Sequence, residues 1–298
     1  MITLDAVTYT YPATVQPALR EVSLSIPDGQ FCAVIGANGA GKSTLCYALS
    51  GFIPHFFRGE LSGRIRIDDV DTPAVTLAEL VQRVGLVFQN PFNQMSGAKF
   101  TVREEVAFGL ENLGVARAEM QTRIARTLER VGITDLSDRS PFALSGGQQQ
   151  RVAIASMLAM DPRVLVLDEP TSQLDPIGTR EVFETIRALI EERGTTVVLA
   201  EHKLEWIAAF ADRLVVLANG RIVMDSSPRQ VLTAPELERF HIGVPRYVQA
   251  ARAAREIGLW PADRDLPVTL DEATEGFSSS SPSSSTRLGL RNSRNSGN

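Results

Sequence analysis

The order of apolar and polar positions predicts a β-rich beginning for this chain. Apolar side chains alternate with polar ones over residues 1–11 and again over residues 22–26, which is the period of a strand buried on one face. Residues 31–35 are all apolar, as in strands that are buried on both faces of a parallel sheet. We therefore expect an N-terminal antiparallel β subdomain, followed by the first strand of a buried sheet.

An alternation of strands with helices fills the second half of the chain. The pattern predicts strands at residues 164–167, 196–200 and 214–217, with helices at 179–191 and 204–211 between them. A helix that connects two strands favours a parallel pair, because the connection must return to the same end of the sheet. The predicted fold class is α/β with a mostly parallel sheet.

The stretch from about residue 90 to 159 is mainly helical in its pattern. Apolar residues recur at helical spacing from Met120 to Val131, so they share one face of the expected helix. We interpret this stretch as a helical subdomain set into the α/β domain. Residues 51–63 show neither period and are predicted to form a loop before a short strand at 64–67.

The C-terminal part of the sequence changes character after residue 240. A short helix is predicted at residues 246–257, and we expect residues 241–275 to form a small α/β extension. Residues 276–298 are mostly Ser, Asn, Gly and Arg, which cannot bury enough apolar surface to offset the entropy of ordering. They are predicted to be a disordered tail, which leaves residues 1–240 as the main domain.

Composition narrows the classes of partner. A net charge of −5 over 298 residues provides no basic field for a nucleic-acid backbone, so no nucleic-acid partner is expected. The two cysteines, Cys32 and Cys46, form no metal-binding pair and are expected to be buried apolar residues. No apolar run approaches the roughly 18 residues of a spanning helix, so any membrane role is expected to depend on a partner.

A phosphate-binding loop follows the strand at residues 31–35. It fits the pattern GxxxxGK[ST] without a mismatch, with Gly36, Ala37, Asn38, Gly39, Ala40, Gly41, Lys42 and Ser43, and Thr44 comes next. Glycines allow backbone N–H groups to turn toward a β-phosphate, the lysine reaches the β and γ oxygens, and the serine hydroxyl is a ligand for Mg²⁺. The loop predicts ATP and Mg²⁺ as ligands.

Two further groups of residues add to this prediction. The strand at 164–167 ends in Asp168 and Glu169; an Asp in this place holds Mg²⁺ in P-loop enzymes, and the next carboxylate can deprotonate the attacking water. A second anion site is indicated where a helix opens with Ser145, Gly146, Gly147 and Gln148. One nucleotide does not need two such sites from one chain, so two copies are expected to meet.

The chain resembles the ABC-family ATPases, whose signature motif is LSGGQ. This family is a branch of the RecA-like P-loop NTPases. The matching motifs run in order from Tyr11 to His202. The resemblance implies that Tyr11 stacks on adenine, Gln89 couples Mg²⁺ and water to a membrane partner, and Glu169 is the catalytic base. It also implies that Asp175 is the D-loop aspartate and that His202 contacts the γ-phosphate. The D-loop departs from the common SALD at Gln173.

Several stretches, such as residues 88–95 and 104–112, resemble the energy-coupling factor (ECF) importers of vitamins and transition metals. The resemblance implies a homodimer, or a heterodimer with a paralogous ATPase, on the cytoplasmic face of the cell membrane. The implied partners are a transmembrane coupling protein and a separate membrane protein that binds the substrate. Phe92, Met95, Phe100 and Phe108 are candidates for a groove that receives the coupling protein, or for core of the helical subdomain.

Two other functions remain open at this point. The first is a soluble ABC ATPase that acts on DNA or ribosomes, although the sequence has neither a long heptad insert nor a second cassette. The second is a nucleotide sensor that does not hydrolyse ATP. The presence of both Glu169 and His202 argues against this function. The transported substrate is not encoded in any residue of this chain, since another polypeptide is expected to bind it.

Overall fold

The computed structural model describes residues 1–279, and the chain divides into the units Met1–Val244 and Pro245–Asn298. The division falls a few residues after the expected boundary at 240. Ile242 and Val244 are both buried, which is consistent with their place in the first unit rather than in an extension.

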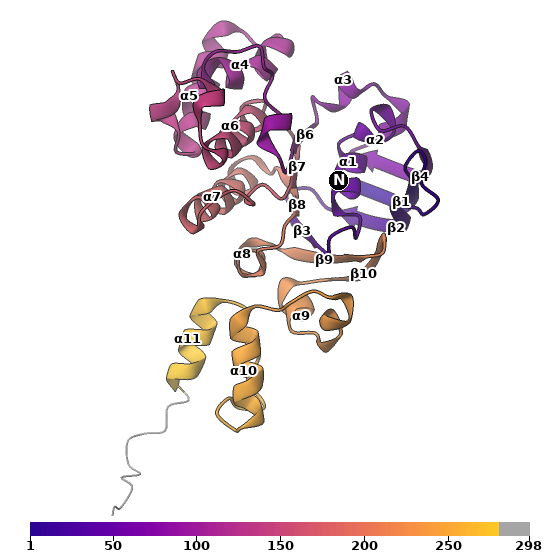
Figure 1. The fold of residues 1–298 in the computed structure, drawn as a ribbon, viewed down its shortest axis with the longest axis vertical. Coiled ribbons are helices and arrows are strands. Elements are labelled where there is room, and N and C mark those ends of the chain that lie inside the picture. Colours follow the sequence, from indigo (N-terminus) through magenta and orange to yellow (C-terminus); the bar gives the residue numbers. More distant parts are fainter. Residues whose placement is uncertain (280–298) are drawn as a thin grey trace, which may run out of the picture. The chain divides into compact units, whose positions relative to one another are not determined.

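Two sheets form the framework of the first unit (Figure 1). The smaller one is antiparallel with the order β2-β1-β4-β5, and the larger one has the order β10-β9-β3-β8-β7-β6. Every neighbouring pair from β9 to β6 is parallel, and β10 is antiparallel to β9. The strands are β1 (Ile2–Thr10), β2 (Leu19–Ile26), β3 (Phe31–Ile35), β4 (Glu60–Ile67), β5 (Val70–Asp71), β6 (Val84–Val87), β7 (Val164–Asp168), β8 (Thr196–Ala200), β9 (Arg213–Ala218) and β10 (Arg221–Ser226).

The predicted α/β class, with its antiparallel N-terminal subdomain and mostly parallel sheet, is confirmed. The helices are α1 (Lys42–Leu49), α2 (Phe52–His55), α3 (Leu77–Leu80), α4 (Val102–Asn112), α5 (Arg117–Arg130), α6 (Gly146–Ala159), α7 (Pro176–Arg193), α8 (Leu204–Phe210), α9 (Pro228–Leu232), α10 (Arg246–Glu256) and α11 (Leu270–Ser279).

Successive residues of the parallel strands fill two different cores, which explains why these strands are apolar throughout. In β7, Val164 and Val166 face one core together with α1 and the smaller sheet. Leu165 and Leu167 face the other, which contains residues of α4, α5, α6 and α7. Because side chains alternate across a strand, a sheet covered on both faces needs apolar residues at every position. The larger sheet is therefore fixed between two layers.

The segment 51–63, expected to be a loop, contains more structure than its pattern indicates. Phe52–His55, labelled α2, is a short turn interrupted by the extended backbone of Ile53, and β4 begins at Glu60 rather than at residue 64. The extra strand residues pair with β1, where Thr10 lies opposite Glu60 and Tyr9 opposite Leu61. The neighbouring strand, rather than the segment's own apolar pattern, determines where β4 begins.

Within residues 101–131, the helical subdomain has two helices rather than one continuous helical stretch. Helix α4 ends at Asn112, and α5 begins at Arg117 after a turn that includes Gly114 with a φ of 69°. The predicted apolar face of α5 is confirmed, since Ile124 and Leu128 are buried and Met120 packs against the same core. Thr101 caps α4 through its hydroxyl, and Glu104 completes the capping box.

The described part of the second unit is helical and contains no strand, which corrects the expected α/β extension. Helix α10 agrees with the predicted helix at residues 246–257 within one residue. Before α11, the Glu272 carboxylate accepts a hydrogen bond from the Val268 backbone at 2.8 Å, and Thr269 accepts one from the Glu272 backbone at 3.3 Å. These two hydrogen bonds cap the start of α11.

Residues 276–279, expected to belong to a disordered tail, are helical, since α11 continues to Ser279. A Cβ added at Gly276 would lie 2.0 Å from a ring carbon of Trp260, and the ring of Phe277 lies 5.0 Å from that of Trp260. Gly276 is therefore packed closely against an aromatic ring. The rest of the predicted disordered tail, residues 280–298, lies outside the described residues.

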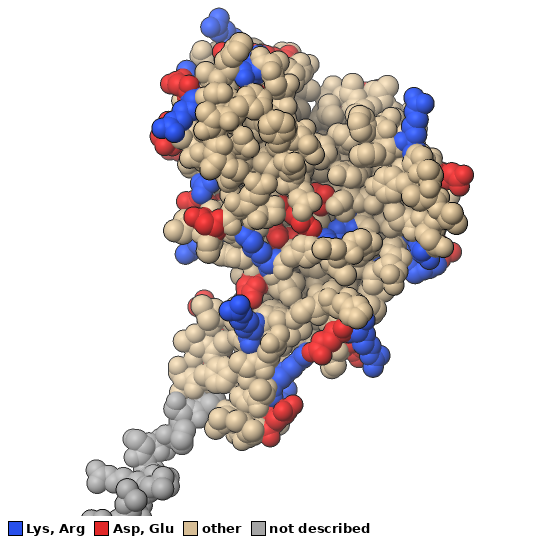
Figure 2. All heavy atoms as spheres, in the orientation of Figure 1, with Lys and Arg blue, Asp and Glu red and all other residues tan. Residues whose placement is uncertain are grey.

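Basic and acidic side chains are mixed on the face drawn in Figure 2, without a large area of either sign. Among residues 1–279, no helix combines the length and the apolar character that a bilayer crossing requires. Cys32 and Cys46 are buried as predicted, and burial raises the pKa of the Cys32 thiol to about 12 and that of Cys46 well above its usual value.

Candidate active site

The predicted site residues lie at the ends of four neighbouring parallel strands, along one edge of the larger sheet. The phosphate loop follows β3, Asp168 ends β7 and Glu169 follows it, His202 follows β8, and Gln89 follows β6. Since these strands are parallel, their carboxyl ends lie together at the sheet edge where α/β proteins bind ligands. The topology thus gathers residues that are more than 150 positions apart in the sequence.

The phosphate loop needs glycine at the two positions where the backbone passes closest to other chain segments. A Cβ at Gly36 would lie 2.4 Å from the Leu217 carbonyl oxygen, and one at Gly41 would lie 2.7 Å from the Ala18 carbonyl oxygen. Gly41 also has a φ of 108°, which side chains other than glycine rarely allow. The close packing fixes the loop directly before α1, whose first residue, Lys42, lines the site.

Lys42 is held inside the loop. Its side chain is 5% exposed, and its ammonium donates hydrogen bonds to the carbonyl oxygens of Gly36 at 3.0 Å and Ala37 at 3.4 Å. The same nitrogen lies 3.8 Å from a carboxylate oxygen of Glu169. A buried cation satisfied mainly by neutral carbonyl groups is well placed to bind an anionic ligand.

Glu169 lies at the centre of the site and contacts three of the other predicted residues. Its carboxylate accepts a hydrogen bond from the Gln89 amide at 2.6 Å and lies 2.8 Å from the His202 Nε2. The backbone of Glu169 has a φ of 48°, an uncommon value for a residue with a side chain. Such strain is typical of functional positions, where the surrounding structure holds an unfavourable conformation.

Asp168 is buried beside the loop and has one carboxylate oxygen without a partner among the described residues. Burial raises the pKa of Asp168 above its usual value; a hydrogen bond from the Ser43 hydroxyl opposes the rise, and the negative charge of Glu169 adds to it. An unpartnered, buried carboxylate oxygen next to a serine hydroxyl offers the hard oxygen ligands that Mg²⁺ prefers.

A hollow of about 610 Å³ opens over these residues. It is lined by Ala18, Asn38, Gly39, Gly41, Lys42, Ser43, Thr44, Gln89, Glu169 and His202. Tyr11 is not part of this lining. Its hydroxyl lies 3.2 Å from the Thr44 hydroxyl, and its ring packs edge to face with those of Tyr9 and Phe57. Tyr11 therefore adjoins the site while its ring belongs to an aromatic cluster.

The signature residues lie in a different hollow, of about 470 Å³. Ser145 caps α6 with the Gln148 side chain in a reciprocal pair of hydrogen bonds, which leaves the glycines at the start of the helix. Asp175 caps α7, where it accepts a hydrogen bond from the Gly178 backbone at 2.7 Å. The lining is formed by Ser145, Gly146, Gly147, Gln148, Arg151, Gln173, Leu174 and Asp175, none of which lines the hollow around Lys42.

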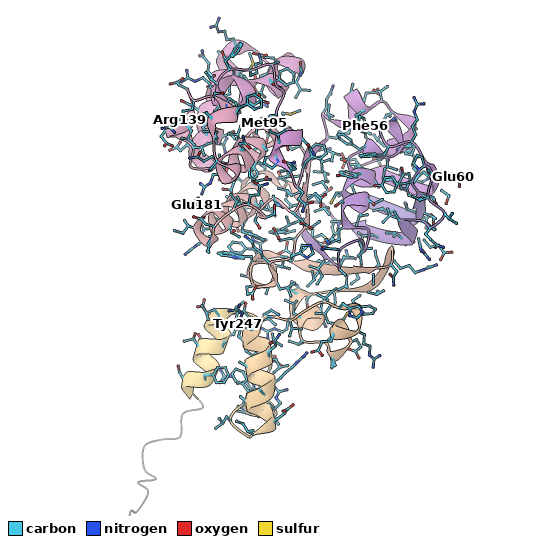
Figure 3. All side chains as sticks on the ribbon, viewed as in Figure 1. Phe56, Glu60, Met95, Arg139, Glu181 and Tyr247 are labelled. Atoms are coloured by element: carbon cyan, nitrogen blue, oxygen red, sulfur yellow. The ribbon has the colours of Figure 1, made fainter. Side chains whose placement is uncertain are left out.

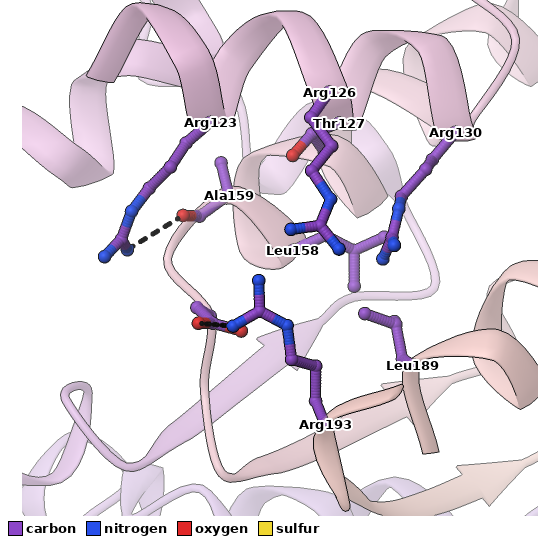
Figure 4. A pocket seen from close by; sticks show the side chains of 9 residues that line it. Arg123, Arg126, Thr127, Arg130, Leu158, Ala159, Leu189 and Arg193 are labelled. Carbon is purple, nitrogen blue, oxygen red and sulfur yellow. Dashed lines mark hydrogen bonds and ion pairs between the residues drawn. The ribbon is translucent and has the colours of Figure 1, made fainter. Parts of the chain in front are cut away.

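A third hollow, between α5 and α7, is lined by four arginines (Figure 4). Arg126 and Arg130 both bind the Glu192 carboxylate, and Arg193 binds Asp161 at 3.0 Å. Arg123 pairs with Glu119 on the same helix. Because each of these arginines has a carboxylate partner, the cluster connects the helical subdomain to α7 and differs from the buried, carbonyl-held cation of the phosphate loop.

The residues proposed for a partner groove separate into two groups. Phe92 is 60% exposed and its ring contacts that of Phe142, which is 46% exposed; Phe100 is also exposed. Met95 packs against the core of the helical subdomain (Figure 3), and Phe108 lies beneath the Lys99 ammonium. Sequence reasoning missed Phe142, whose position three residues before Ser145 could have indicated it.

The family profile described as "ABC transporter" matches residues 19–172, just over half of the chain. This chain belongs to the ABC transporter family. It is an ATP-binding subunit that hydrolyses ATP to power transport, as members of this family do. An "energy-coupling factor transporter ATP-binding protein EcfA2" of Symbiobacterium thermophilum is 43% identical over 279 residues, covering 91% of this chain and 93% of the relative.

Two solved structures of this ABC family are similar to the fold. The structure of cbiO1 from Clostridium perfringens, described as part of the ABC transporter complex cbiONQ, has a TM-score of 0.69 and 33% identity, and the match covers 80% of this chain and 92% of that one. A dimeric ATP-binding cassette in a post-hydrolysis state, bound to ADP and Pi, has a TM-score of 0.68 and 30% identity over 77% of this chain and 99% of the other.

Proposed function

We propose that this ABC transporter ATPase is the energy-supplying subunit of an ECF-type importer for a vitamin or a transition metal. The observation that carries the proposal is the separation of the phosphate loop and the signature into two hollows of one chain. Neither hollow has the groups of the other, so a complete site needs a second subunit. The named ECF relative and the cbiO1 structure support the ECF branch.

ATP binds through the phosphate loop in this proposal, with Lys42 on the β and γ oxygens and backbone N–H groups of the loop around the β-phosphate. The ring of Tyr11 stacks on adenine after it turns from the aromatic cluster. The Ser43 hydroxyl, the free oxygen of Asp168 and the Gln89 amide oxygen hold Mg²⁺, which neutralises phosphate charge when bound. The orphaned buried oxygen of Asp168 supports this ligand set.

Hydrolysis is assigned to Glu169. A water oxygen attacks the γ-phosphorus, its proton passes to the Glu169 carboxylate, and the bond to the β–γ bridging oxygen breaks. His202 lies 2.8 Å from Glu169 and is placed to contact both the carboxylate and a γ-phosphate oxygen. Gln89 contacts the other carboxylate oxygen at 2.6 Å and orients the water as the loop residues close around ATP.

The second subunit supplies Ser145, Gly146, Gly147 and Gln148 to the γ-phosphate and Asp175 to the interface. A helix N-terminus with two glycines presents backbone N–H groups to an anion, and the dipole of α6 favours negative charge there. Closure of such a head-to-tail dimer around ATP then moves the transmembrane partners. The partner ATPase is a second copy of this chain or a paralogue.

The composite site predicts that two inactive variants restore each other. Lys42→Ala disables the phosphate loop, and Gly147→Arg blocks the signature hollow; each variant alone is expected to lose ATP hydrolysis. In a mixed dimer, the intact phosphate loop of the Gly147→Arg chain faces the intact signature of the Lys42→Ala chain, which makes one complete site. We expect the mixture to recover up to about half of the normal activity per mixed dimer, because one site of two is intact.

The measurement is the steady-state release of phosphate as the two variants are mixed at a constant total concentration. A maximum at the equal mixture is expected. As a control, Lys42→Ala mixed with a second loop variant, Ser43→Ala, should stay inactive at every ratio. Failure of the first mixture to exceed its components would contradict the composite site.

The membrane connection is proposed through the surface formed by Phe92 and Phe142. Gln94 bonds the Phe88 backbone and the Ala153 carbonyl oxygen, so the segment that follows Gln89 is attached to the signature helix α6. A transmembrane coupling protein that binds at Phe92 would therefore respond to both half-sites of the chain, the phosphate loop and the signature. The chain then lies on the cytoplasmic face of the cell membrane, with the substrate bound by a separate membrane protein.

A further inference from the structure

The three residues that follow β8, Glu201, His202 and Lys203, make contacts in two different places. The ring of His202 is directed at Glu169, in the hollow around Lys42. Its neighbours, Glu201 and Lys203, instead contact the D-loop, residues 171–175. Glu201 is 2% exposed, and its carboxylate accepts hydrogen bonds from the Thr171 hydroxyl and from the His202 backbone.

Lys203 holds the D-loop at both ends. Its ammonium donates hydrogen bonds to the carbonyl oxygens of Thr171 at 2.9 Å and Leu174 at 3.3 Å. A third bond, at 2.7 Å, reaches the hydroxyl of Thr179 in the first turn of α7. Three acceptors use all three donors of an ammonium group, so the D-loop and the start of α7 are fixed relative to His202.

The apex of the held loop lies on the signature. A Cβ added at Gly146 would come within 2.1 Å of the Gln173 side-chain oxygen, and one at Gly147 within 3.2 Å of the Gln173 carbonyl oxygen. Gln173, Leu174 and the two glycines line the same hollow. The glycines thus leave room for the D-loop, and a shift of this loop must change the surface that faces the other subunit's nucleotide.

We propose that Lys203 is a positioning residue that couples the two half-sites of one chain. When His202 moves to meet the γ-phosphate on its own phosphate loop, Lys203 carries the D-loop with it, and Gln173 adjusts the signature surface. ATP bound at the phosphate loop of one subunit then positions the signature of the same subunit to bind the nucleotide of its partner. The inference rests on the proposed composite dimer.

The test measures dimer formation by the full chain in Mg²⁺ and an ATP analogue with a non-cleavable β–γ bridge. Lys203→Met removes the ammonium and keeps the aliphatic stem. We expect the dimer dissociation constant to rise about 10-fold or more, as for the loss of a charged hydrogen-bond donor. Binding of the analogue to the monomer should change less than about 2-fold, because Lys203 does not line the hollow around Lys42.

Two more variants separate coupling from a general loss of structure. Thr179→Val keeps Lys203 and removes one of its three acceptors, so it should weaken the dimer in the same direction by a smaller factor. Lys99→Met makes the same substitution at a lysine that binds Glu111 elsewhere, and it should leave dimer formation unchanged. Melting temperatures of all variants are measured in parallel.

The decisive comparison adds His202→Ala. If Lys203 transmits the position of His202, then His202→Ala weakens the dimer in the original chain but by less than about 2-fold in the Lys203→Met background. Additive effects would overturn the inference, as would Lys203→Met behaving like Lys99→Met. If the original chain itself forms no dimer with the analogue, the proposed composite site fails instead.

Discussion

Replacing Glu169 with Gln is expected to lower ATP turnover by about 10²–10⁴-fold, as for loss of a general base, while ATP affinity stays near normal. The amide keeps the shape of the side chain and can still contact Gln89 and His202, which lie 2.6 Å and 2.8 Å from the carboxylate. Asp168 and Ser43 remain in place beside the loop. The expected product is a dimer trapped with ATP, detected by single-turnover kinetics and nucleotide retention.

Lys42→Ala is the informative comparison for this variant. It deletes the buried ammonium that we propose binds the phosphate oxygens, so ATP affinity should fall by about 10–100-fold and turnover should collapse with it. Equilibrium binding of a fluorescent ATP analogue separates the two cases. An equal loss of affinity in both variants would show that Glu169 supports the structure of the site and is not the base.

Phe92→Asp is expected to weaken assembly with the membrane partner by about 30-fold, which is the effect of losing an interface hot spot. Phe92 and Phe142 expose adjoining rings, and a carboxylate in place of one ring would be buried without a partner in the complex. ATP binding should be unaffected, because neither ring lines the hollow around Lys42. The readouts are co-purification with the transmembrane protein and nucleotide affinity.

Ile257→Asp is a matched control, since Ile257 is 72% exposed and belongs to the other unit of the chain. Met95→Asp is not a test of the groove. Because Met95 packs against the core of the helical subdomain, its replacement should lower the melting temperature as well as assembly. Unchanged assembly and uptake with Phe92→Asp would place the docking surface elsewhere.

The sequence predicts the parallel sheet well because the burial of a strand on two faces leaves a continuous apolar run. Residues 31–35 and 196–200 form strands with those bounds. The pattern fails where partners outside the segment decide the structure. Residues 60–63 become strand through pairing with β1.

Some parts of the candidate site could also be predicted from the sequence, and others could not. The phosphate loop and the Asp168–Glu169 pair are local motifs, so their placement at one sheet edge follows from the order of strands. The contacts of Lys203 could not be predicted, since they join an otherwise ordinary residue after His202 to backbone carbonyl groups of a separate loop. Hydrogen bonds to backbone atoms of a distant segment leave no pattern in residue types.

The central claim, a head-to-tail dimer closed by ATP, is tested most directly by crosslinking Asn38→Cys to Ser145→Cys in the Glu169→Gln background. Asn38 and Ser145 are exposed in the two hollows, whereas the natural cysteines are buried with raised thiol pKa values, so only the introduced thiols should react. The account predicts a disulfide between two chains that forms with ATP and Mg²⁺ and is lost with Lys42→Ala. A crosslink that forms within single chains, or equally well without ATP, would contradict it.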